Sequence, residues 1–229
     1  MNSIAKGAIG LGGVGTATGG GILANHLINS KEERNLSSKL KEDKFTLLNL
    51  DVSKQESDDS KWQTIFTSYA TLTTDKANLK IGNLTLNSAG DKNAGIKQLK
   101  EVCSSLLNTQ PESSDFDKNY QLASQWCVEP ISVGSILQKR GITYLDTTGS
   151  ENSKEWGEIA KEYEKIQTES KKPLSEVTWT QVASEDYSTN ITAIKGACNT
   201  RKAKSSHQEG FLDALKEAQS WCSITSKNR

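Results

Sequence analysis

The sequence predicts a mainly helical protein, of the α+β type with a few short strands, in which a transmembrane helix precedes two tandem copies of one small module. Three observations lead to this prediction. A glycine-rich apolar segment occupies residues 7–29 and contains no Lys, Arg, Asp or Glu. After it, apolar residues recur at every third or fourth position, as on one face of a helix. Finally, the Trp and Cys residues of the first half recur about 95 positions later in the second half.

The apolar segment follows a short stub, residues 1–6, and we expect it to anchor the chain in a membrane. Its apolar part would form a helix of roughly 33 Å, which spans a hydrocarbon core of about 30 Å. Gly15 and Gly19 have the G-x-x-x-G spacing that lets two membrane helices approach closely. A cleaved signal peptide is one alternative, although no clear A-x-A site follows. A nucleotide site is another, because Gly10–Gly15 matches G-x-G-x-x-G, but too few residues precede it for the strand that this motif requires.

The remainder divides into a linker, residues 30–35, and two modules, residues 36–131 and 132–229. The division rests on an internal repeat, which is the feature that decides the fold of a tandem protein. Three groups of aromatic, aliphatic and cysteine residues recur in register with offsets of 94 or 95 positions: Trp62, Ile65, Tyr69 with Trp156, Ile159, Tyr163; Ile96, Leu99, Lys100, Cys103 with Ile191, Ile194, Lys195, Cys198; and Phe116, Ala123, Trp126, Cys127 with Phe211, Ala218, Trp221, Cys222.

Each module is predicted to run as helix, short strand, Trp helix, extended segment, Cys helix and Trp-Cys helix. Tryptophan followed by Ile at +3 and Tyr at +7 marks one helix face, and the cysteine segments have similar spacing. Asp58, Ser60 and Ser153 are candidate N-caps for the Trp helices. The predicted strands are 45–50, 79–86, 142–146 and 177–182.

The four cysteines favour one disulfide in each module. Four cysteines allow three pairings, and the repeat favours Cys103–Cys127 and Cys198–Cys222, each joining two consecutive helices. Buried free thiols and a zinc site are the alternatives, although the close C-x₂₋₄-C pairs of structural zinc sites are absent from the sequence. Disulfides would indicate an oxidising, extracellular setting.

The repeated aromatic residues are expected to form the core of each module. They lie at amphipathic helix positions, where large aromatic side chains are usually buried. Trp179 has no counterpart in module one, so it is the tryptophan that we expect to be most exposed. The residues assigned to the repeat core are Trp62, Tyr69, Trp126, Trp156, Tyr163 and Trp221.

Composition and motifs do not indicate catalysis, a metal or a cofactor. The two histidines, His26 and His207, have no counterpart in the other module, which argues against a Cys/His nucleophile pair. The acidic residues around Asp51 lack the ordered spacing of a calcium loop and are interpreted as a solvated cap. Basic and acidic residues number 28 each, so the charge gives no argument for nucleic acid as a partner. We therefore expect a protein that is not an enzyme.

The sequence resembles the large paralogous protein families of haemotrophic mycoplasmas. The resemblance rests on the short N-terminus with its Gly/Ala-rich apolar segment and on four short motifs: Ser38-Lys39-Leu40, Lys61-Trp62, Trp126-Cys127 and Trp221-Cys222. It covers nearly the whole chain. It implies a membrane-associated, surface-displayed and antigenically variable protein, and it implies no catalytic residue.

The leading functional hypothesis is a single-pass protein of the cell membrane whose modules are extracellular and contact a host or cell-surface protein. Lysines are more frequent after the apolar segment than before it, which by the positive-inside rule favours cytoplasmic modules. The expected disulfides favour the opposite orientation, and long domains translocate largely regardless of charge. The alternatives are a membrane-tethered intracellular scaffold with reduced cysteines and an enzyme of unrecognised type.

Overall fold

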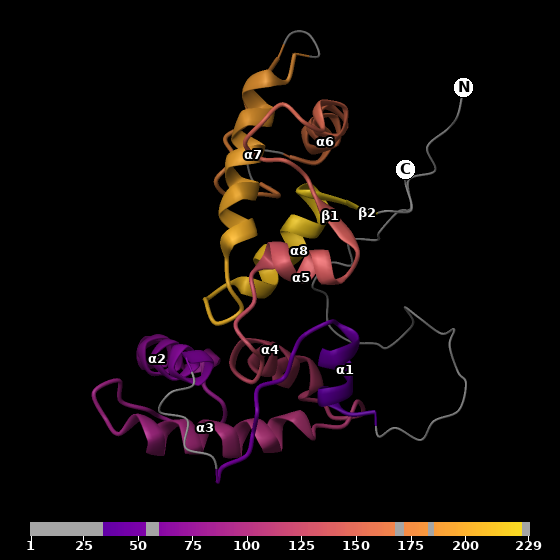
Figure 1. Cartoon of the computed structure of the whole chain (residues 1–229). Coiled ribbons are helices and arrows are strands. Elements are labelled where there is room, and N and C mark those ends of the chain that lie inside the picture. The colour runs from indigo at the N-terminus through magenta and orange to yellow at the C-terminus, as the bar shows by residue number, and fades with distance from the viewer. Residues whose placement is uncertain (1–33, 54–59, 168–171, 183–185, 226–229) are drawn as a thin grey trace. The chain divides into compact units, whose positions relative to one another are not determined.

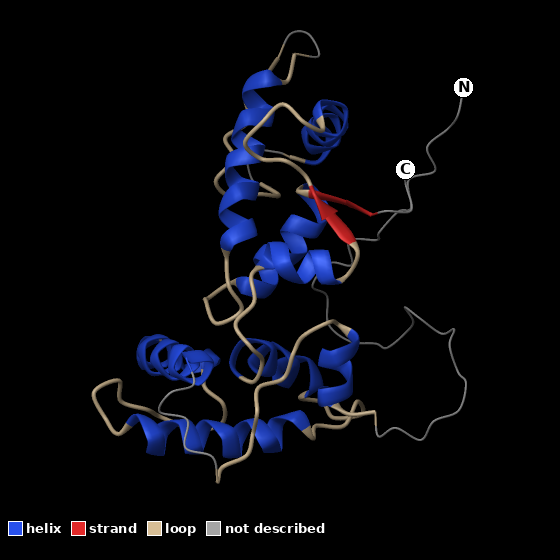
Figure 2. Cartoon of the chain, viewed as in Figure 1, coloured by secondary structure: helices blue, strands red, loops and turns tan. Residues whose placement is uncertain are grey.

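The computed structural model describes residues 34–53, 60–167, 172–182 and 186–225, and it confirms a mainly helical protein (Figures 1 and 2). The predicted anchor at residues 7–29, with Gly15 and Gly19, lies outside the described residues. None of the described helices is both long and apolar enough to cross a bilayer. The helices are α1 (Leu36–Glu42), α2 (Ser60–Asp75), α3 (Lys92–Leu107), α4 (Phe116–Trp126), α5 (Val133–Lys139), α6 (Ser153–Ile166), α7 (Ser188–Ala203) and α8 (Phe211–Trp221), with a 3-10 turn η1 (Ala77–Leu79).

In the first half of the chain, α1 packs against α3 and α4, α2 against α3, and α3 against α4. A second group joins α5 to α7 and α8, α6 to α7, and α7 to α8. In both groups the helix that carries the first cysteine, α3 or α7, contacts each of the other three helices in its half. The central position follows from its sequence, because apolar residues every three or four positions give it a continuous buried face.

The first helix of each half begins and ends in the same way. Asn35 caps α1 by accepting from the Ser38 amide, and Ser132 caps α5 by accepting from the Ser135 amide. After each C-cap the chain takes a left-handed conformation, with a φ of 69° at Lys44 and 71° at Gly141. A left-handed residue is a common helix stop, and glycine adopts it without the steric cost that lysine incurs.

The structure contains fewer strands than the sequence predicts. Within the described residues, β1 (Ile142–Tyr144) pairs antiparallel with β2 (Ser223–Thr225), in the register Thr143↔Ile224. This confirms the first three residues of the predicted strand at 142–146. The predicted strand at 45–50 is wrong beyond one isolated bridge, Leu47↔Val128.

The predicted strands at 79–86 and 177–182 are also wrong, and side chains explain why. The Tyr69 hydroxyl accepts from the Ile81 amide at 3.0 Å and donates to the Leu84 carbonyl at 3.0 Å. The buried Asn190 amide group bonds both the N–H and the C=O of Thr180, at 2.8 Å each. Backbone groups must find partners when they are buried, and here a side chain replaces the neighbouring strand.

The predicted caps of the Trp helices need correction. The N-cap of α6 is Asn152, whose φ is 60°, and Ser153 is the first residue of the helix. Helix α2 begins at Ser60 rather than after it. Asp58 lies outside the described residues. The Asn152 amide oxygen accepts instead from the Asp146 backbone at 3.1 Å and so holds the preceding loop.

Candidate functional site

The cysteines form the two predicted disulfides. The sulfur atoms are 2.07 Å apart in Cys103–Cys127 and 1.98 Å apart in Cys198–Cys222, and each pair is 24 positions apart in sequence. All four cysteines are fully buried. Paired sulfurs cannot act as zinc ligands or nucleophiles, so these cysteines are structural in the oxidised protein.

Each disulfide lies where a helical hairpin meets the segment after the first helix. It joins α3 to the end of α4 in one half, and α7 to the end of α8 in the other. The carbonyl of Cys127 accepts from the Leu48 amide at 3.1 Å, and that of Cys222 accepts from the Leu145 amide at 2.9 Å. Each disulfide therefore constrains three parts of its half.

A tyrosine and a tryptophan pack edge to face next to each disulfide. Tyr69 and Trp126 have ring centroids 5.1 Å apart, and Tyr163 and Trp221 have centroids 5.2 Å apart. Such pairs stabilise a core by roughly 0.5–1.5 kcal/mol beyond area burial. Burial raises the pKa of both tyrosines, so both remain neutral hydroxyls over the physiological range.

The other two repeated tryptophans lie beneath lysine ammonium groups. The Lys100 Nζ is 5.9 Å from the Trp62 ring centroid and donates to the Asp51 carbonyl at 2.8 Å. The Lys195 Nζ lies 5.6 Å from the Trp156 ring and donates to the Gly149 carbonyl at 2.7 Å. Each lysine fastens the loop before a Trp helix over its tryptophan, at a distance typical of cation–π contacts. Lys100 and Lys195 occupy matching positions of the sequence repeat, but the repeat alone gives no indication of this role.

Trp179 is half-buried rather than the exposed residue that the sequence led us to expect. It stacks on Tyr163 with ring centroids 5.4 Å apart and planes 16° apart, and its other neighbour is Tyr187 at 6.0 Å. Its indole N–H is buried and has no hydrogen-bond partner among the residues that the structure describes. The sequence contains one indication of this burial. Trp179 has no counterpart in the first half, so it packs where the two halves differ.

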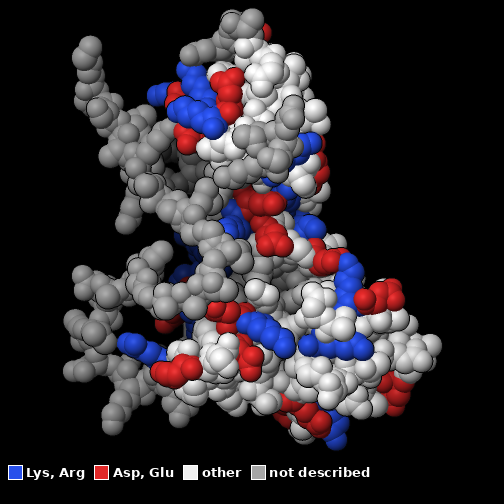
Figure 3. Space-filling view, turned by 180° about the vertical axis from the view of Figure 1, so that it is seen from behind, with Lys and Arg blue, Asp and Glu red and all other residues white. Residues whose placement is uncertain are grey.

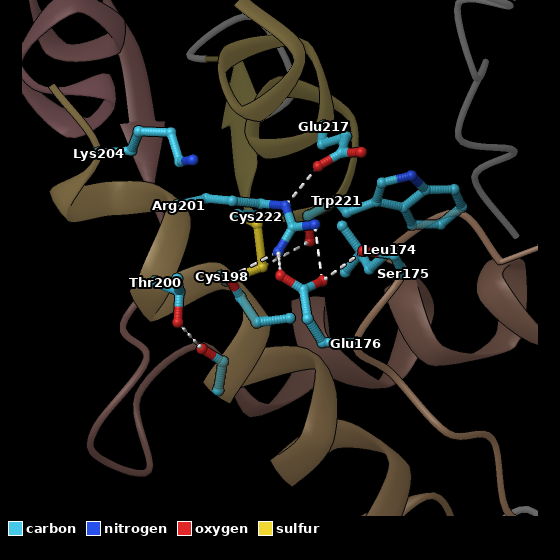
Figure 4. A network of polar contacts seen from close by, with 12 residues as sticks. Leu174, Ser175, Glu176, Cys198, Thr200, Arg201, Lys204, Glu217, Trp221 and Cys222 are labelled. Atoms are coloured by element: carbon cyan, nitrogen blue, oxygen red, sulfur yellow. Dashed lines mark hydrogen bonds and ion pairs between the residues drawn. A yellow bond between two sulfur atoms is a disulfide. The ribbon is translucent and has the colours of Figure 1, made fainter. Parts of the chain in front are cut away.

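A network of charged side chains centres on the buried Arg201, and Figure 4 shows its guanidinium between two glutamates. Arg201 is 5% exposed. Its Nη1 and Nη2 donate to Glu176 at 3.1 and 2.9 Å, and its Nε donates to Glu217 at 2.6 Å. Hydrogen bonding to Arg201 holds the pKa of Glu176 below its usual value. Burial disfavours the charged arginine, but the two carboxylates still raise the pKa of Arg201 above its ordinary value.

The Arg201 network joins three segments that the sequence does not relate. Arg201 lies near the end of α7 and Glu217 lies in α8, while Glu176 belongs to the irregular segment after α6. The residues 95 positions earlier than Arg201 and Glu217 are Leu106 and Leu122, both buried. The arginine and glutamate of this ion pair thus lie 95 positions after two buried leucines, which is why the repeated apolar pattern in the sequence did not reveal the ion pair.

Removing the charge of Arg201 alone is expected to destabilise the protein. We expect Arg201→Leu to lower the free energy of unfolding by about 2–3 kcal/mol, less than for a fully buried pair because both glutamates reach solvent. Arg201→Leu/Glu217→Leu should recover most of this loss, since well-packed apolar residues often replace an ion pair without cost. Urea unfolding of both variants measures the difference, and a double variant less stable than the single one would falsify this account.

Two polar pockets lie in the described part of the chain. One, of about 280 Å³, is lined by side chains of α4 and by the start of α8. The other, of about 530 Å³, lies beside α5 and β1 and includes Tyr144 and Lys202. Among the described residues, no group of three His, Cys, Asp or Glu side chains could hold a metal ion. Basic and acidic side chains are intermixed on the face drawn in Figure 3.

The remaining candidates from the sequence have local structural roles. The Asp51 carboxylate accepts from the backbone and hydroxyl of Ser53, at 2.9 and 2.6 Å, as in a solvated turn. His207 Nδ1 lies 3.0 Å from the Ser205 hydroxyl. Burial lowers the pKa of His207, so the neutral imidazole predominates at neutral pH. No family model, curated protein or solved structure matches this chain.

Proposed function

We propose that this chain is a membrane-anchored, surface-displayed protein that contacts host or cell-surface proteins and has no enzymatic activity. In this proposal residues 7–29 form the anchor, and residues 36–131 and 132–229 are duplicated extracellular modules. Its kinship is with the paralogous families of haemotrophic mycoplasmas. The observation that carries the proposal is the pair of buried disulfides, one in each half.

Disulfides support an extracellular location because they persist in oxidising environments and are rare in reducing ones. Apolar residues are only 34% of the chain, so a small module gains much of its stability from such a cross-link. A protein with a lean core and two cross-links suits exposure outside the cell. An intracellular scaffold would have to fold with the same thiols reduced.

The duplication is supported by contacts that are found within each of the two halves. The two disulfides, the two Tyr–Trp pairs and the two Lys–Trp contacts each have one member in either half. These three kinds of contact are shared by the halves, whereas other positions differ between them. A pair of related modules with different surfaces suits a protein that presents two contact areas to partners.

Protease treatment of intact cells tests the display. We expect externally added protease to remove the modules while the membrane stays sealed, because an anchored extracellular domain is accessible. A cytoplasmic protein of the same cells serves as the control for sealing. An intact chain after treatment, together with degradation after the cells are lysed, would place the modules inside and reject the proposal.

Mass mapping under non-reducing conditions distinguishes the proposal from the scaffold alternative. Thiols are trapped with an alkylating reagent at the moment of lysis, and peptides are then assigned. We expect Cys103 linked to Cys127 and Cys198 linked to Cys222, with little alkylation. Alkylated cysteines at all four positions would favour the membrane-tethered intracellular scaffold.

A further inference from the structure

The two halves share a disulfide-linked helical hairpin but differ in what holds the segment before it. In the first half Leu106 and Leu122 are buried on α3 and α4. In the second half the residues 95 positions later are Arg201 and Glu217, and Glu176 completes the network. Apolar contacts do not depend on protons, whereas carboxylates lose their charge in acid.

We propose that the Arg201 network is an acid-released clamp, which holds residues 174–180 on α7 and α8 at neutral pH and frees them when Glu176 is protonated. In the clamped form Trp179, which belongs to this segment, stacks on the ring of Tyr163. The proposal concerns the conformation of this half and does not depend on the surface display proposed above.

Both glutamates of the clamp bind the same cation, the Arg201 guanidinium. Besides the two glutamates, the Arg201 guanidinium reaches only the Ala197 carbonyl within the described residues, at 3.1 Å. Protonation of Glu176 would take away the carboxylate that binds both Nη atoms of this buried guanidinium, which is unfavourable. The charged or titratable groups around it are Glu176 from the segment after α6, Glu217 from α8, Tyr163 from α6, Tyr144 from β1 and Lys204 from the end of α7.

Among these groups, Glu176 is the one whose loss of charge in acid would release the segment. Burial raises the pKa of both tyrosines, so they stay neutral in acid. The pKa of Glu176 is lower in the folded protein than in the unfolded chain. Its stabilisation is therefore complete above the ordinary glutamate pKa of about 4.3 and is lost as the pH falls through the lower folded value.

Residues 174–180 need such a restraint because few other polar contacts hold them. Residues 174–180 form no regular strand, and the Tyr163 hydroxyl bonds only the Leu174 amide and carbonyl, at 3.2 and 3.3 Å. Farther along, Asn190 holds Thr180. Between these two points Glu176 supplies a bidentate contact, the geometry in which arginine binds a carboxylate most strongly. Its release would leave the middle of the segment without polar attachment.

Hydrogen exchange of the full chain at a series of pH values tests the clamp. Protection factors are corrected for the intrinsic pH dependence of exchange and followed for peptides covering residues 174–180 and, as an internal reference, residues 79–86. From pH 7 to about pH 3.5 we expect protection of the first peptide to fall by about tenfold, the effect of losing one hydrogen-bonded contact to a charged group. The reference should change by less than about twofold, because it has no such ion pair.

Two variants separate the clamp from general acid unfolding. Glu176→Gln/Glu217→Gln removes both negative charges that bind Arg201, so residues 174–180 should have low protection already at pH 7, with no further fall in acid. Arg201→Leu/Glu217→Leu copies the residues of module one and should give a flat pH profile. An equal loss in both wild-type peptides, full protection in the glutamine variant or a persistent fall in the leucine variant would each overturn the proposal.

Discussion

Removal of the Cys198–Cys222 disulfide by Cys198→Ala/Cys222→Ala is expected to lower the free energy of unfolding by about 3–4 kcal/mol. The bridge closes a loop between residues 24 positions apart, and a cross-link of that span restricts the unfolded chain by this amount in the chain-entropy model. A small domain has a total stability of only about 5–15 kcal/mol. Alanine is preferred to serine because both sulfur positions are fully buried and offer a hydroxyl little solvent.

The first half provides a matched experiment. Cys103 and Cys127 are also 24 positions apart and also fully buried, so Cys103→Ala/Cys127→Ala should produce a loss of the same size. Urea unfolding, with and without a reductant, measures both. The wild type should become similar to the variants once its disulfides are reduced. A loss below about 1 kcal/mol for either variant would show that the hydrophobic core alone stabilises that half.

Gly95→Ala is expected to destabilise the protein by about 1–3 kcal/mol. Alanine normally stabilises a helix interior relative to glycine by about 0.8–1 kcal/mol. At this position, however, the new Cβ would overlap the ring of Phe66, approaching its Cδ2 to 2.9 Å. Phe66 is 1% exposed and lies in the core, so the ring has no free space into which to move. Overpacking of this kind outweighs the gain in helix propensity.

Gly196→Ala is the control for the backbone effect. Gly196 lies within α7, and a methyl group at this position would meet no atom of another residue within 4 Å beyond its own helix backbone and chain neighbours. This substitution should therefore stabilise the protein by about 0.5–1 kcal/mol. The two Gly→Ala variants should shift the urea midpoint in opposite directions. A shift in the same direction for both would mean that Phe66 moves away without cost.

The Phe66–Gly95 contact also marks a difference between the halves in which a change at one position is compensated by a change at the other. Phe66 packs against Gly95 in the first half, and the residues 94 and 95 positions later are Ala160 and Asn190. A large side chain facing a glycine is thus replaced by a small side chain and an asparagine. Asn190 is buried and uses its amide group to hold Thr180. Cores tolerate such exchanges when the total volume is kept.

The helices and the disulfides could be predicted from the sequence because their signals are local or repeated. Apolar residues at helical spacing mark the buried faces of α2, α3 and α4 without reference to any other element. The pairing of Cys103 with Cys127 follows from equal spacing in two copies. In both cases the chain itself contains the information, and tertiary packing only has to agree with it.

The strands were the weakest predictions, because a strand requires a partner that the sequence does not identify. Residues 142–144 pair with β2. Residues 79–86 have the same β-forming character but no neighbouring strand among the described residues. There the hydroxyl of Tyr69 satisfies the backbone instead. Sheet propensity depends on the surrounding packing to a greater degree than helix propensity does.

The sequence by itself determined the helical class, the repeated aromatic and cysteine positions and the disulfide pairing, because each depends on short-range periodicity or on comparison between copies. Only the tertiary structure decided the contacts that differ between the halves. The Arg201 network joins residues 25 and 16 positions apart, and Lys100 reaches a carbonyl 49 positions away. Long charged side chains bury their aliphatic carbons and extend their charged groups to a distant partner. The contacts that they make therefore depend on which segments the fold brings together.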